Sequence, residues 1–310
     1  MQRYNSFGPH MRQIFGSKVY KVNVDAGFTC PNRDGNLGYS GCIYCNNDSF
    51  RPSSCKPSLP IADQVKNGIS HTKKRFSAAR FLVYFQAYTN TYAPVEQLEQ
   101  LYVEALSEPD VIGLAIGTRP DAVDPEKIAL LESLAAKYFI LVEYGLQSMY
   151  DKSLEFIQRG HDYQAFLRAV EMTRGRGIHM GAHLIAGFPT ESRQETLAMA
   201  EEISSLPIEF LKVHQLQIIK DTPLALMYEE NPFPVFGYQE YLDFLADFIQ
   251  RTSPHIVFQR LFATAPDEIL IAPAWGKNRH QILNDIERNF EGKDVIQGKM
   301  FCAHAAGTKP

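Results

Sequence analysis

The stretch TCPNRDGNLGYSGCIYC, residues 29–45, holds three of the five cysteines of this 310-residue chain. Eleven residues separate Cys30 from Cys42, and two separate Cys42 from Cys45. A C-x2-C pair can present both sulfurs to one metal centre, and the three glycines that precede Cys42 let the chain turn tightly around it. The stretch follows directly on an apolar, β-branched run. It therefore predicts a metal-binding loop at the end of a strand.

Apolar, β-branched runs recur along the chain and alternate with segments of helical period. This alternation is typical of βα units around a parallel sheet. Six such runs are expected to be strands: residues 19–28, 81–86, 111–118, 138–145, 179–187 and 210–218. Helices are expected between them, for example over 94–107 and over 124–137, where Asp124 and Pro125 suit the cap and the first turn. Six units predict an α/β fold, a partial (β/α)6 TIM-like barrel that binds ligands at the C-terminal ends of its strands.

The rest of the chain divides around this barrel. We expect a lead-in over residues 1–18, the barrel over 19–221, a C-terminal α/β extension packed on the barrel over 222–297, and a flexible tail over 298–310. Three prolines between residues 222 and 235 mark the change of pattern. The extension contains expected helices over 238–252 and 277–292 and an expected strand over 255–262.

Composition limits the classes of function. The chain is 45% hydrophobic, enough for a large core, and its 31 Lys and Arg against 35 Asp and Glu give a formal charge of −4. The chain lacks the overall basic excess that is typical of DNA-binding proteins, so we expect no DNA partner. We also expect no membrane contact, because no apolar window is long enough to span a membrane. The N-terminus shows no leader pattern, so we expect a cytoplasmic protein.

The cysteines allow three interpretations. A structural zinc site wants four ligands, yet Cys55 and Cys302 stand alone in the sequence and are expected to be inert thiols. A redox pair of Cys42 and Cys45 leaves Cys30 without a role. A [4Fe-4S] cluster held by three thiolates keeps one iron open and needs no fourth cysteine.

The cysteine stretch and the βα pattern together resemble the radical S-adenosylmethionine (SAM) superfamily. The long interval between the first two cysteines, with VEYGLQSMYDKSLEFIQRGHDYQAF and GAHLIAGFPTES, resembles the branch that contains the catalytic subunit of the Elongator complex. RYNSFG, YFQAYTNTYAP, IGTRPD and IAPAWG are similar to motifs of a compact bacterial subfamily linked to modification of the wobble uridine of tRNA.

The resemblance implies two cofactors, a [4Fe-4S] cluster on Cys30, Cys42 and Cys45, and SAM on the open iron. One electron from a donor such as flavodoxin or ferredoxin then cleaves SAM to a 5'-deoxyadenosyl radical, in a site that excludes water. Tyr44 occupies the place of the aromatic residue that precedes the last cysteine in this superfamily.

Further SAM contacts are expected at the strand ends. Gln86 stands where relatives have a glycine-rich turn that holds the SAM amine, and it offers a side-chain carbonyl. Gln147 and Arg159 match residues that hold SAM in the similar coproporphyrinogen oxidases, and Ile185 is expected near the adenine. Glu143 is an acid inside an apolar strand, which is costly to bury without a functional partner. Thr118, in GTRPD, suits either a ribose contact or a capped turn.

Other polar residues receive structural interpretations. His183 and His214, both in expected strands, are interpreted as hydrogen-bonded interior residues rather than as site residues. Tyr84, Tyr88 and Tyr92 are assigned to packing. Contact with RNA would come either from a local basic patch, formed by groups such as Arg75, Arg80, Lys277 and Arg279, or from a partner that presents the RNA.

The resemblance suggests a substrate, the C5 side chain of the wobble uridine in tRNA. A small metabolite is the alternative within the same chemistry, as in the coproporphyrinogen oxidases. A binding protein with a zinc-stabilised loop is the non-enzymatic alternative.

Overall fold

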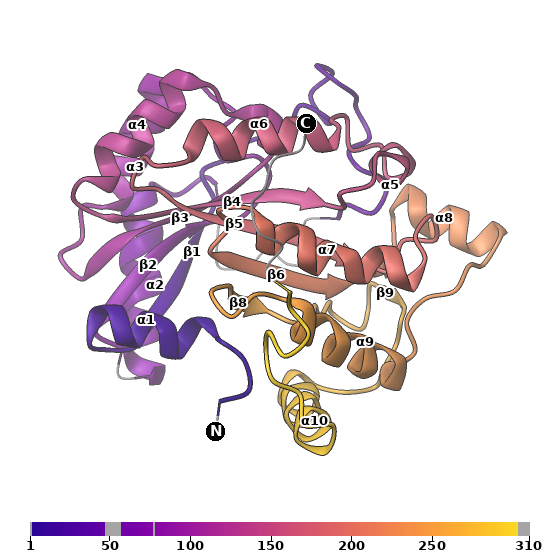
Figure 1. Cartoon of the computed structure of the whole chain (residues 1–310). Coiled ribbons are helices and arrows are strands. Elements are labelled where there is room, and N and C mark those ends of the chain that lie inside the picture. The colour runs from indigo at the N-terminus through magenta and orange to yellow at the C-terminus, as the bar shows by residue number, and fades with distance from the viewer. Residues whose placement is uncertain (1, 47–56, 77, 303–310) are drawn as a thin grey trace, which may run out of the picture.

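A curved parallel sheet forms the centre of the molecule (Figure 1). The structure is a computed structural model that describes residues 2–46, 57–76 and 78–302. Adjacent strands are all parallel, in the order β1-β2-β3-β4-β5-β6-β8. The strands are β1 (Val19–Val24), β2 (Arg80–Phe85), β3 (Val111–Thr118), β4 (Phe139–Gln147), β5 (His179–Ala186), β6 (Phe210–Gln215) and β8 (Val257–Arg260). The six expected strands are confirmed, and the sheet is an open half-barrel.

The seventh strand, β8, comes from the segment that we expected to pack on the barrel as an extension. Val257 lies beside Phe210, so β8 continues the sheet in parallel with β6 instead of covering it. An uncovered β6 would leave a row of unpaired backbone groups at the sheet edge. Pairing with β8 satisfies the first part of that row. The C-terminal segment therefore forms one wall of the half-barrel.

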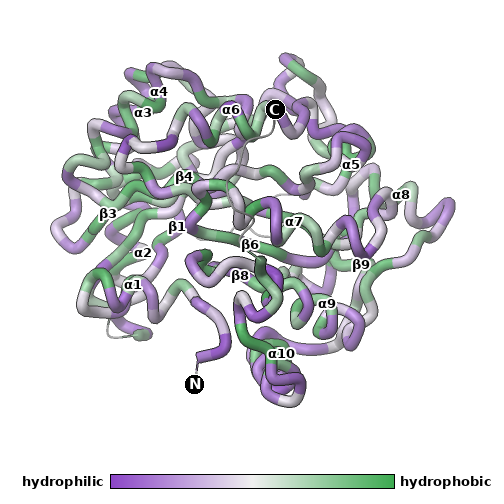
Figure 2. The backbone as a smooth tube through the Cα atoms, viewed as in Figure 1, coloured by the Kyte–Doolittle hydropathy of each residue, from purple (hydrophilic) through white to green (hydrophobic). Residues whose placement is uncertain are grey.

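Amphipathic helices cover the outside of the sheet (Figure 1). They are α2 (Ile61–Phe76), α3 (Val95–Ala105), α4 (Pro125–Ala135), α6 (Tyr163–Thr173), α7 (Arg193–Ser205) and α9 (Tyr238–Arg251). As expected, Asp124 caps α4: its side chain accepts from the Lys127 amide at 3.0 Å. The main core lies between these helices and the sheet, and Figure 2 shows hydrophobic stretches along β3 and β6. The outward faces of the strands are thus used for packing, and the inward faces are free for a site.

Helix α1 (Phe7–Phe15) closes the N-terminal end of the half-barrel. Met11 is fully buried, and the rings of Phe7 and Phe15 each lie 5.8 Å from an aromatic ring at the start of a strand, Phe210 and Phe139 respectively. Because these partners begin β6 and β4, the helix fills the bottom of the barrel. The opposite end, where the strands finish, stays available for ligands.

The remaining elements are short or peripheral. They are the 3-10 helix η2 (Pro120–Ala122), α5 (Asp151–Phe156), α8 (Pro223–Glu230), α10 (Arg279–Gly292) and an antiparallel pair, β7 (Ile218–Ile219) with β9 (Leu270–Ala272). The start of the expected tail is held, since the amides of Gly298 and Met300 donate to carbonyls of α9. The end of that tail and Cys55 lie outside the described residues. Nowhere in the described ranges is a helix long and apolar enough to cross a membrane.

Candidate active site

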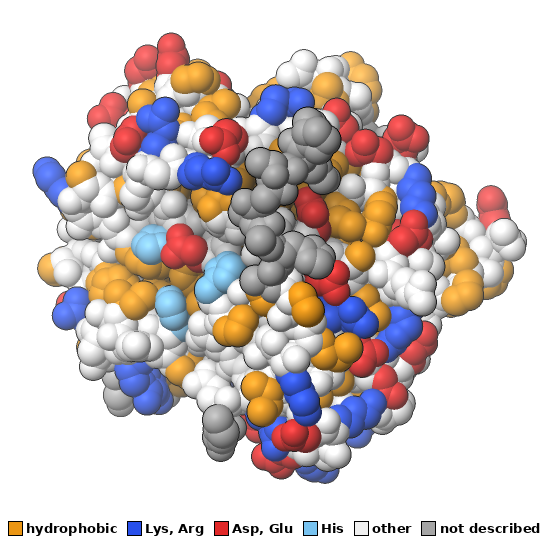
Figure 3. Space-filling model, viewed as in Figure 1, with side chains coloured by type: hydrophobic (Ala, Val, Ile, Leu, Met, Phe, Trp, Pro, Cys, Tyr) orange, Lys and Arg blue, Asp and Glu red, His pale blue; other side chains and the backbone are white. Residues whose placement is uncertain are grey.

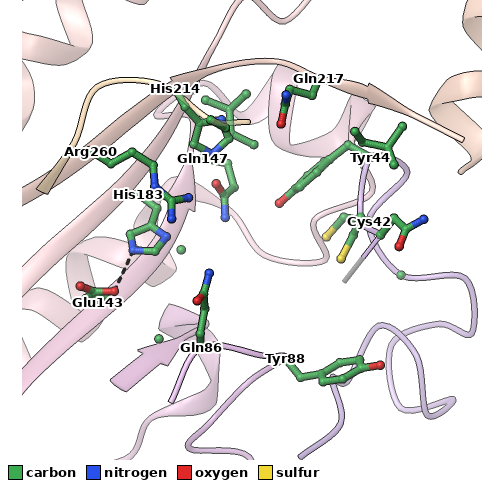
Figure 4. A pocket seen from close by; sticks show the side chains of 18 of the residues that line it. Cys42, Tyr44, Gln86, Tyr88, Glu143, Gln147, His183, His214, Gln217 and Arg260 are labelled. Atoms are coloured by element: carbon green, nitrogen blue, oxygen red, sulfur yellow. Dashed lines mark hydrogen bonds and ion pairs between the residues drawn. The ribbon is translucent and has the colours of Figure 1, made fainter. Parts of the chain in front are cut away.

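A cavity of about 520 Å³ opens at the C-terminal ends of the strands. Its size falls within the ordinary range of cofactor sites, about 300–1,000 Å³. All ten residues that the sequence predicts for the site line it: Cys30, Cys42, Tyr44, Cys45, Gln86, Thr118, Glu143, Gln147, Arg159 and Ile185. Figure 4 shows Cys42 and Tyr44 at one end and Glu143, His183 and Arg260 at the other. The cavity therefore has two chemically different ends.

The cysteine end is built by the loop that follows β1. Gly35 and Gly41 adopt positive φ angles of 92° and 77°, which a side chain would strain, and the Cys45 amide donates to the Cys42 carbonyl at 2.9 Å. This turn directs both C-x2-C residues to the cavity. Cys42 is buried and Cys30 and Cys45 are half-buried, and all three are free thiols.

The spacing of these thiols bears on which metal centre they fit. Within the part of the chain that the structure describes, no three His, Cys, Asp or Glu side chains converge closely enough for a single metal ion. Zinc needs four ligands around one ion, so this arrangement does not suit the zinc interpretation. Three thiolates that bind three irons of one cluster stand further apart. Among the described residues, three cysteines and no fourth line the cavity, and this donor set fits a [4Fe-4S] cluster with one open iron.

Arg159 lies directly behind the cysteines. Its Nη1 donates to Cys42 Sγ at 3.5 Å and its Nη2 to the Gly145 carbonyl at 2.5 Å, while Asn32 Nδ2 also approaches Cys42 Sγ at 3.5 Å. Burial alone would lower the pKa of Arg159, but the Cys42 thiolate beside it raises the pKa above its usual value. Positive charge and N–H donors against the sulfur are the arrangement expected around an anionic cluster.

Two buried guanidinium groups keep free donors at this end of the cavity. Arg159 Nε and Arg119 Nη1 have no hydrogen-bond partner among the described residues, although such buried groups are normally satisfied. Arg119 otherwise pairs with Asp121, through two contacts of 2.9 and 2.7 Å. Thr118 is bonded to Thr91 at 2.6 Å between hydroxyl oxygens. The unpaired N–H groups of Arg159 and Arg119 are therefore available to donate hydrogen bonds to an anionic or carbonyl-bearing cofactor.

Backbone strain marks the middle of the cavity wall. Gln147, at the end of β4, has φ 74°, and Tyr88, just after β2, has φ 63°. Non-glycine residues rarely adopt this region, and when they do they cluster at functional sites. A Cβ at Gly145 would lie 2.8 Å from Arg159 Nη2 and 2.9 Å from Gln147 Nε2, so only glycine lets both side chains approach.

Glu143 has partners within the protein that account for its burial, and its expected contact with the cofactor stays a prediction. Its carboxylate is fully buried and accepts from Lys21 Nζ at 2.9 Å, from Lys212 Nζ, and from His183 Nε2 at 3.1 Å. Burial alone would raise the pKa of Glu143, but Lys21 and Lys212 hold it well below the usual value. The carboxylate is therefore ionised and neutralised by the two lysines beneath the cavity floor.

Sequence reasoning missed three residues of this end. His183, His214 and Arg260 line the cavity, although the histidines were interpreted as interior residues and Arg260 was not singled out. The hydrogen bond of His183 to Glu143 is as interpreted, but its ring also faces the cavity (Figure 4). Strand alternation could have revealed this, because His183 and Ile185 share a face.

The four residues of the expected basic patch lie at two different ends of the barrel. Arg75 and Arg80 lie at the end of α2 and the start of β2, whereas Arg279 lines the cavity at the opposite end of the strands. Lys277 is paired with Asp285 at 3.1 Å. Parallel strands separate their first and last residues by the length of the strand, so Arg75 and Arg80 cannot contact a ligand that is held in the cavity beside Arg279.

Fold and site together define a half-barrel protein with a cysteine loop at a ligand cavity. The chain belongs to the radical SAM superfamily: the model of that superfamily matches residues 29–203, and that of the radical SAM C-terminal domain matches residues 208–291. The chain is therefore an enzyme, and its cofactors are a [4Fe-4S] cluster and SAM. The two predicted cofactors are thus confirmed, and the assignment of Cys30, Cys42 and Cys45 as the ligands of the cluster stays a prediction.

Relatives of similar length support this assignment. The chain is 31% identical over 303 residues to the uncharacterized protein YtqA of Bacillus subtilis, covering 97% of this chain and 93% of that one. It is 35% identical over 295 residues to protein YhcC of Escherichia coli K12, covering 95% and 94%. A shorter match, 25% identity over 147 residues, joins 46% of this chain to 27% of a tRNA uridine(34) acetyltransferase of Methanocaldococcus jannaschii.

A solved structure agrees with the fold. Archaeal Elp3 from Methanocaldococcus infernus, with its N-terminus deleted, superposes with a TM-score of 0.70 at 18% identity, over 91% of this chain and 64% of that one. At this identity the likeness establishes the fold alone.

Proposed function

We propose that this radical SAM enzyme acts on the C5 side chain of the wobble uridine in tRNA. One observation carries the substrate: the match of 147 residues to a tRNA uridine(34) acetyltransferase, a protein whose name specifies this base. The archaeal Elp3 structure supports the proposal because it has the same fold.

In this proposal Cys30, Cys42 and Cys45 would bind three irons of the cluster, and SAM would bind the fourth. When bound, the two cofactors supply a 5'-deoxyadenosyl radical that removes a hydrogen atom from the substrate. The electron comes from a low-potential donor such as flavodoxin or ferredoxin.

The chain's own residues would hold and shield these groups. Arg159 sits behind Cys42 and would balance the charge of the cluster. Gln147 and Gln86 offer amide donors and acceptors to SAM from the ends of β4 and from the turn after β2, and Thr118 offers a hydroxyl. Ile185 and Tyr44 present apolar surface, which excludes water from the reacting atoms.

The proposal is tested on tRNA nucleosides. A strain that lacks the gene is complemented with the wild-type chain or with Cys42→Ser, and the nucleosides of its tRNA are compared by mass spectrometry. We expect one C5-modified wobble uridine to disappear in the deletion strain and to return with the wild-type chain only. An identical wobble profile in all strains would overturn the tRNA substrate.

A small metabolite is the second candidate, and charge favours it. The formal charge is −4, and acidic and basic side chains are interspersed on the face in Figure 3, so the surface offers little generic attraction to a polyanion. An unchanged nucleoside profile, together with 5'-deoxyadenosine production by the reconstituted enzyme, would favour this candidate.

A further inference from the structure

Two arginines from the C-terminal segment face the cavity at the end opposite the cysteines. Arg260 ends β8 and Arg279 begins α10, and both line the cavity. Figure 4 shows Arg260 beside His183 and His214. The Arg279 guanidinium lies 5.5 Å from the centre of the Phe262 ring, which supports it without neutralising it.

Neither arginine has a counter-ion in the part of the chain that the structure describes. Among the residues that the structure describes, no carboxylate lies within ion-pair distance of Arg260 or Arg279. Glu143 is the one described carboxylate in the cavity lining, and Lys21 and Lys212 already share it. This end of the cavity therefore carries uncompensated positive charge.

The other arginines of the cavity show that this is unusual. Arg119 pairs with Asp121, Arg159 donates to Cys42 and Gly145, and Arg33 donates to the Cys45 carbonyl at 2.6 Å. No hydrogen bond within the described chain uses the guanidinium of Arg260 or Arg279. Their forks, each able to bind an anion through two parallel N–H groups, remain available.

The two charges also repel one another. Burial and the nearby charge of Arg260 together lower the pKa of Arg279. A fold that brings two cations together in one cavity, with no acid paired to either of them among the described residues, stabilises neither, so an anionic ligand would relieve a cost that is built into the site.

We propose that Arg260 and Arg279 form a subsite for an anionic group of the substrate, a phosphate or a carboxylate. The inference deepens the proposed function and rests on it only in that the substrate occupies this cavity. His183 and His214 flank Arg260, but each uses its one N–H within the protein, on the Glu143 carboxylate and on the Gln215 carbonyl, so the two arginines would supply the donors to this group. The target atom would then lie between this anchor and the cofactor end.

A second cavity continues the path past Arg279. It has a volume of about 620 Å³ and shares Gln217, Ala263, Thr264 and Arg279 with the first. Arg279 therefore stands at the junction, where it could bind the anion while the remainder of a larger substrate extends into the second cavity.

The first test measures anion binding to the holoenzyme, reconstituted with cluster and saturated with SAM. Inorganic phosphate and acetate are titrated at constant ionic strength, and Tm is recorded for wild type, Arg260→Gln, Arg279→Gln and Arg288→Gln. Arg288 lies on the same helix as Arg279 with its side chain 74% exposed, outside the cavity lining, and serves as the matched control.

We expect phosphate, acetate or both to raise Tm in wild type and in Arg288→Gln. The apparent affinity should be about 10- to 100-fold weaker in Arg260→Gln and Arg279→Gln, because each removes charge-assisted hydrogen bonds. Without anion, both variants should melt at or above wild type, since the repulsion is gone. No stabilisation of wild type beyond that of chloride, or equal anion affinity in all four proteins, would overturn the subsite.

The second test distinguishes the sources of the anion. An anticodon stem-loop RNA is bound with its natural phosphates or with methylphosphonates on both sides of the wobble uridine. If the subsite binds a backbone phosphate, the methylphosphonates should weaken binding about 10-fold or more in wild type, and much less in Arg279→Gln. If the methylphosphonates weaken binding equally in wild type and in Arg279→Gln, the subsite does not bind the RNA phosphate. The subsite is then assigned to a carboxylate if acetate, but not phosphate, raised Tm in the first test.

Failure of the proposed function has a separate signature. If wild type does not bind the stem-loop at all, but phosphate or acetate still stabilises it in an arginine-dependent manner, the subsite stands and the tRNA substrate falls.

Discussion

The two ends of the cavity are assembled in opposite ways. The cysteine end comes from one continuous loop, residues 29–45, in which the sulfurs lie close in sequence and are backed by Arg159. The opposite end takes its polar side chains from β1, β4, β5, β6, β8 and α10. Lys21 and Glu143, for example, meet across 122 residues of chain. A local loop can hold a cofactor that is common to a superfamily, whereas a composite wall can change one strand at a time to suit a substrate.

The largest expected effect falls at the cysteine end. Cys42→Ser should abolish the visible absorption of the cluster and the formation of 5'-deoxyadenosine from SAM and reductant, because three thiolates are the minimum set with one open iron. Cys302→Ser, at an exposed free cysteine, is the control and should keep both signals. If Cys42→Ser kept both the cluster absorption and the formation of 5'-deoxyadenosine, Cys42 would not be a ligand of the cluster, and the cysteine loop would not be the cofactor end of the cavity.

At the opposite end, Glu143→Gln should lower the free energy of unfolding by about 3–5 kcal/mol. The change leaves Lys21 and Lys212 without a counter-charge, and breaking a buried ion pair costs this much. Urea unfolding measures it.

The control for this change is Glu132→Gln, which breaks the exposed pair with Arg176 and should cost about 1 kcal/mol or less. Equal losses in the two variants would show that Glu143 is not held by the lysines. If Glu143→Gln instead weakened SAM binding without any loss of stability, Glu143 would be assigned to the SAM site.

A smaller effect is expected from pH. Burial lowers the pKa of His183 to about 3 and that of His214 to about 4, so the folded chain leaves both uncharged while the unfolded chain protonates them near pH 6.5. The unfolded state binds more protons between these values, and the free energy of unfolding therefore falls as pH falls. At pH 5 each histidine should account for about 2 kcal/mol.

His214→Gln should reduce this loss between pH 7 and pH 5 in urea unfolding. His71→Gln is the control, since His71 is exposed on α2 and should leave the slope as in wild type. Parallel slopes in all three proteins would mean that the opposite end tolerates a charged His214.

The smallest effect concerns the wall between the two ends. Gln147→Gly should raise the free energy of unfolding by up to about 1 kcal/mol, because it relieves a left-handed backbone conformation, and it should weaken SAM binding if the amide contacts SAM. Gln158→Gly, at φ 53° and outside the cavity lining, should gain similar stability with unchanged SAM affinity. Unchanged SAM affinity in both variants would remove Gln147 from the cofactor site.

Much of the fold follows from local pattern, and the errors occur where the chain leaves the sheet. The expected strand 210–218 ends at Gln215, and its last residue, Ile218, belongs to a separate short strand, β7. Period-two alternation also placed His183 on the face of Ile185, yet residue type alone favoured an interior role. Alternation along a strand shows which face of the sheet a residue occupies, but it does not show whether that face packs in a core or lines a cavity.

The sequence by itself determined the class of chemistry. Both of its signals are local in the sequence. The three cysteines lie within one short loop after a strand, and each of the six βα units is formed by neighbouring residues. Only the tertiary structure decided that β8 completes the sheet, that Glu143 is neutralised by Lys21 and Lys212, and that Arg260 and Arg279 face one cavity without a paired acid among the described residues. The reason is that the register of parallel strands brings together side chains from distant segments, and charge balance is a property of that assembled wall.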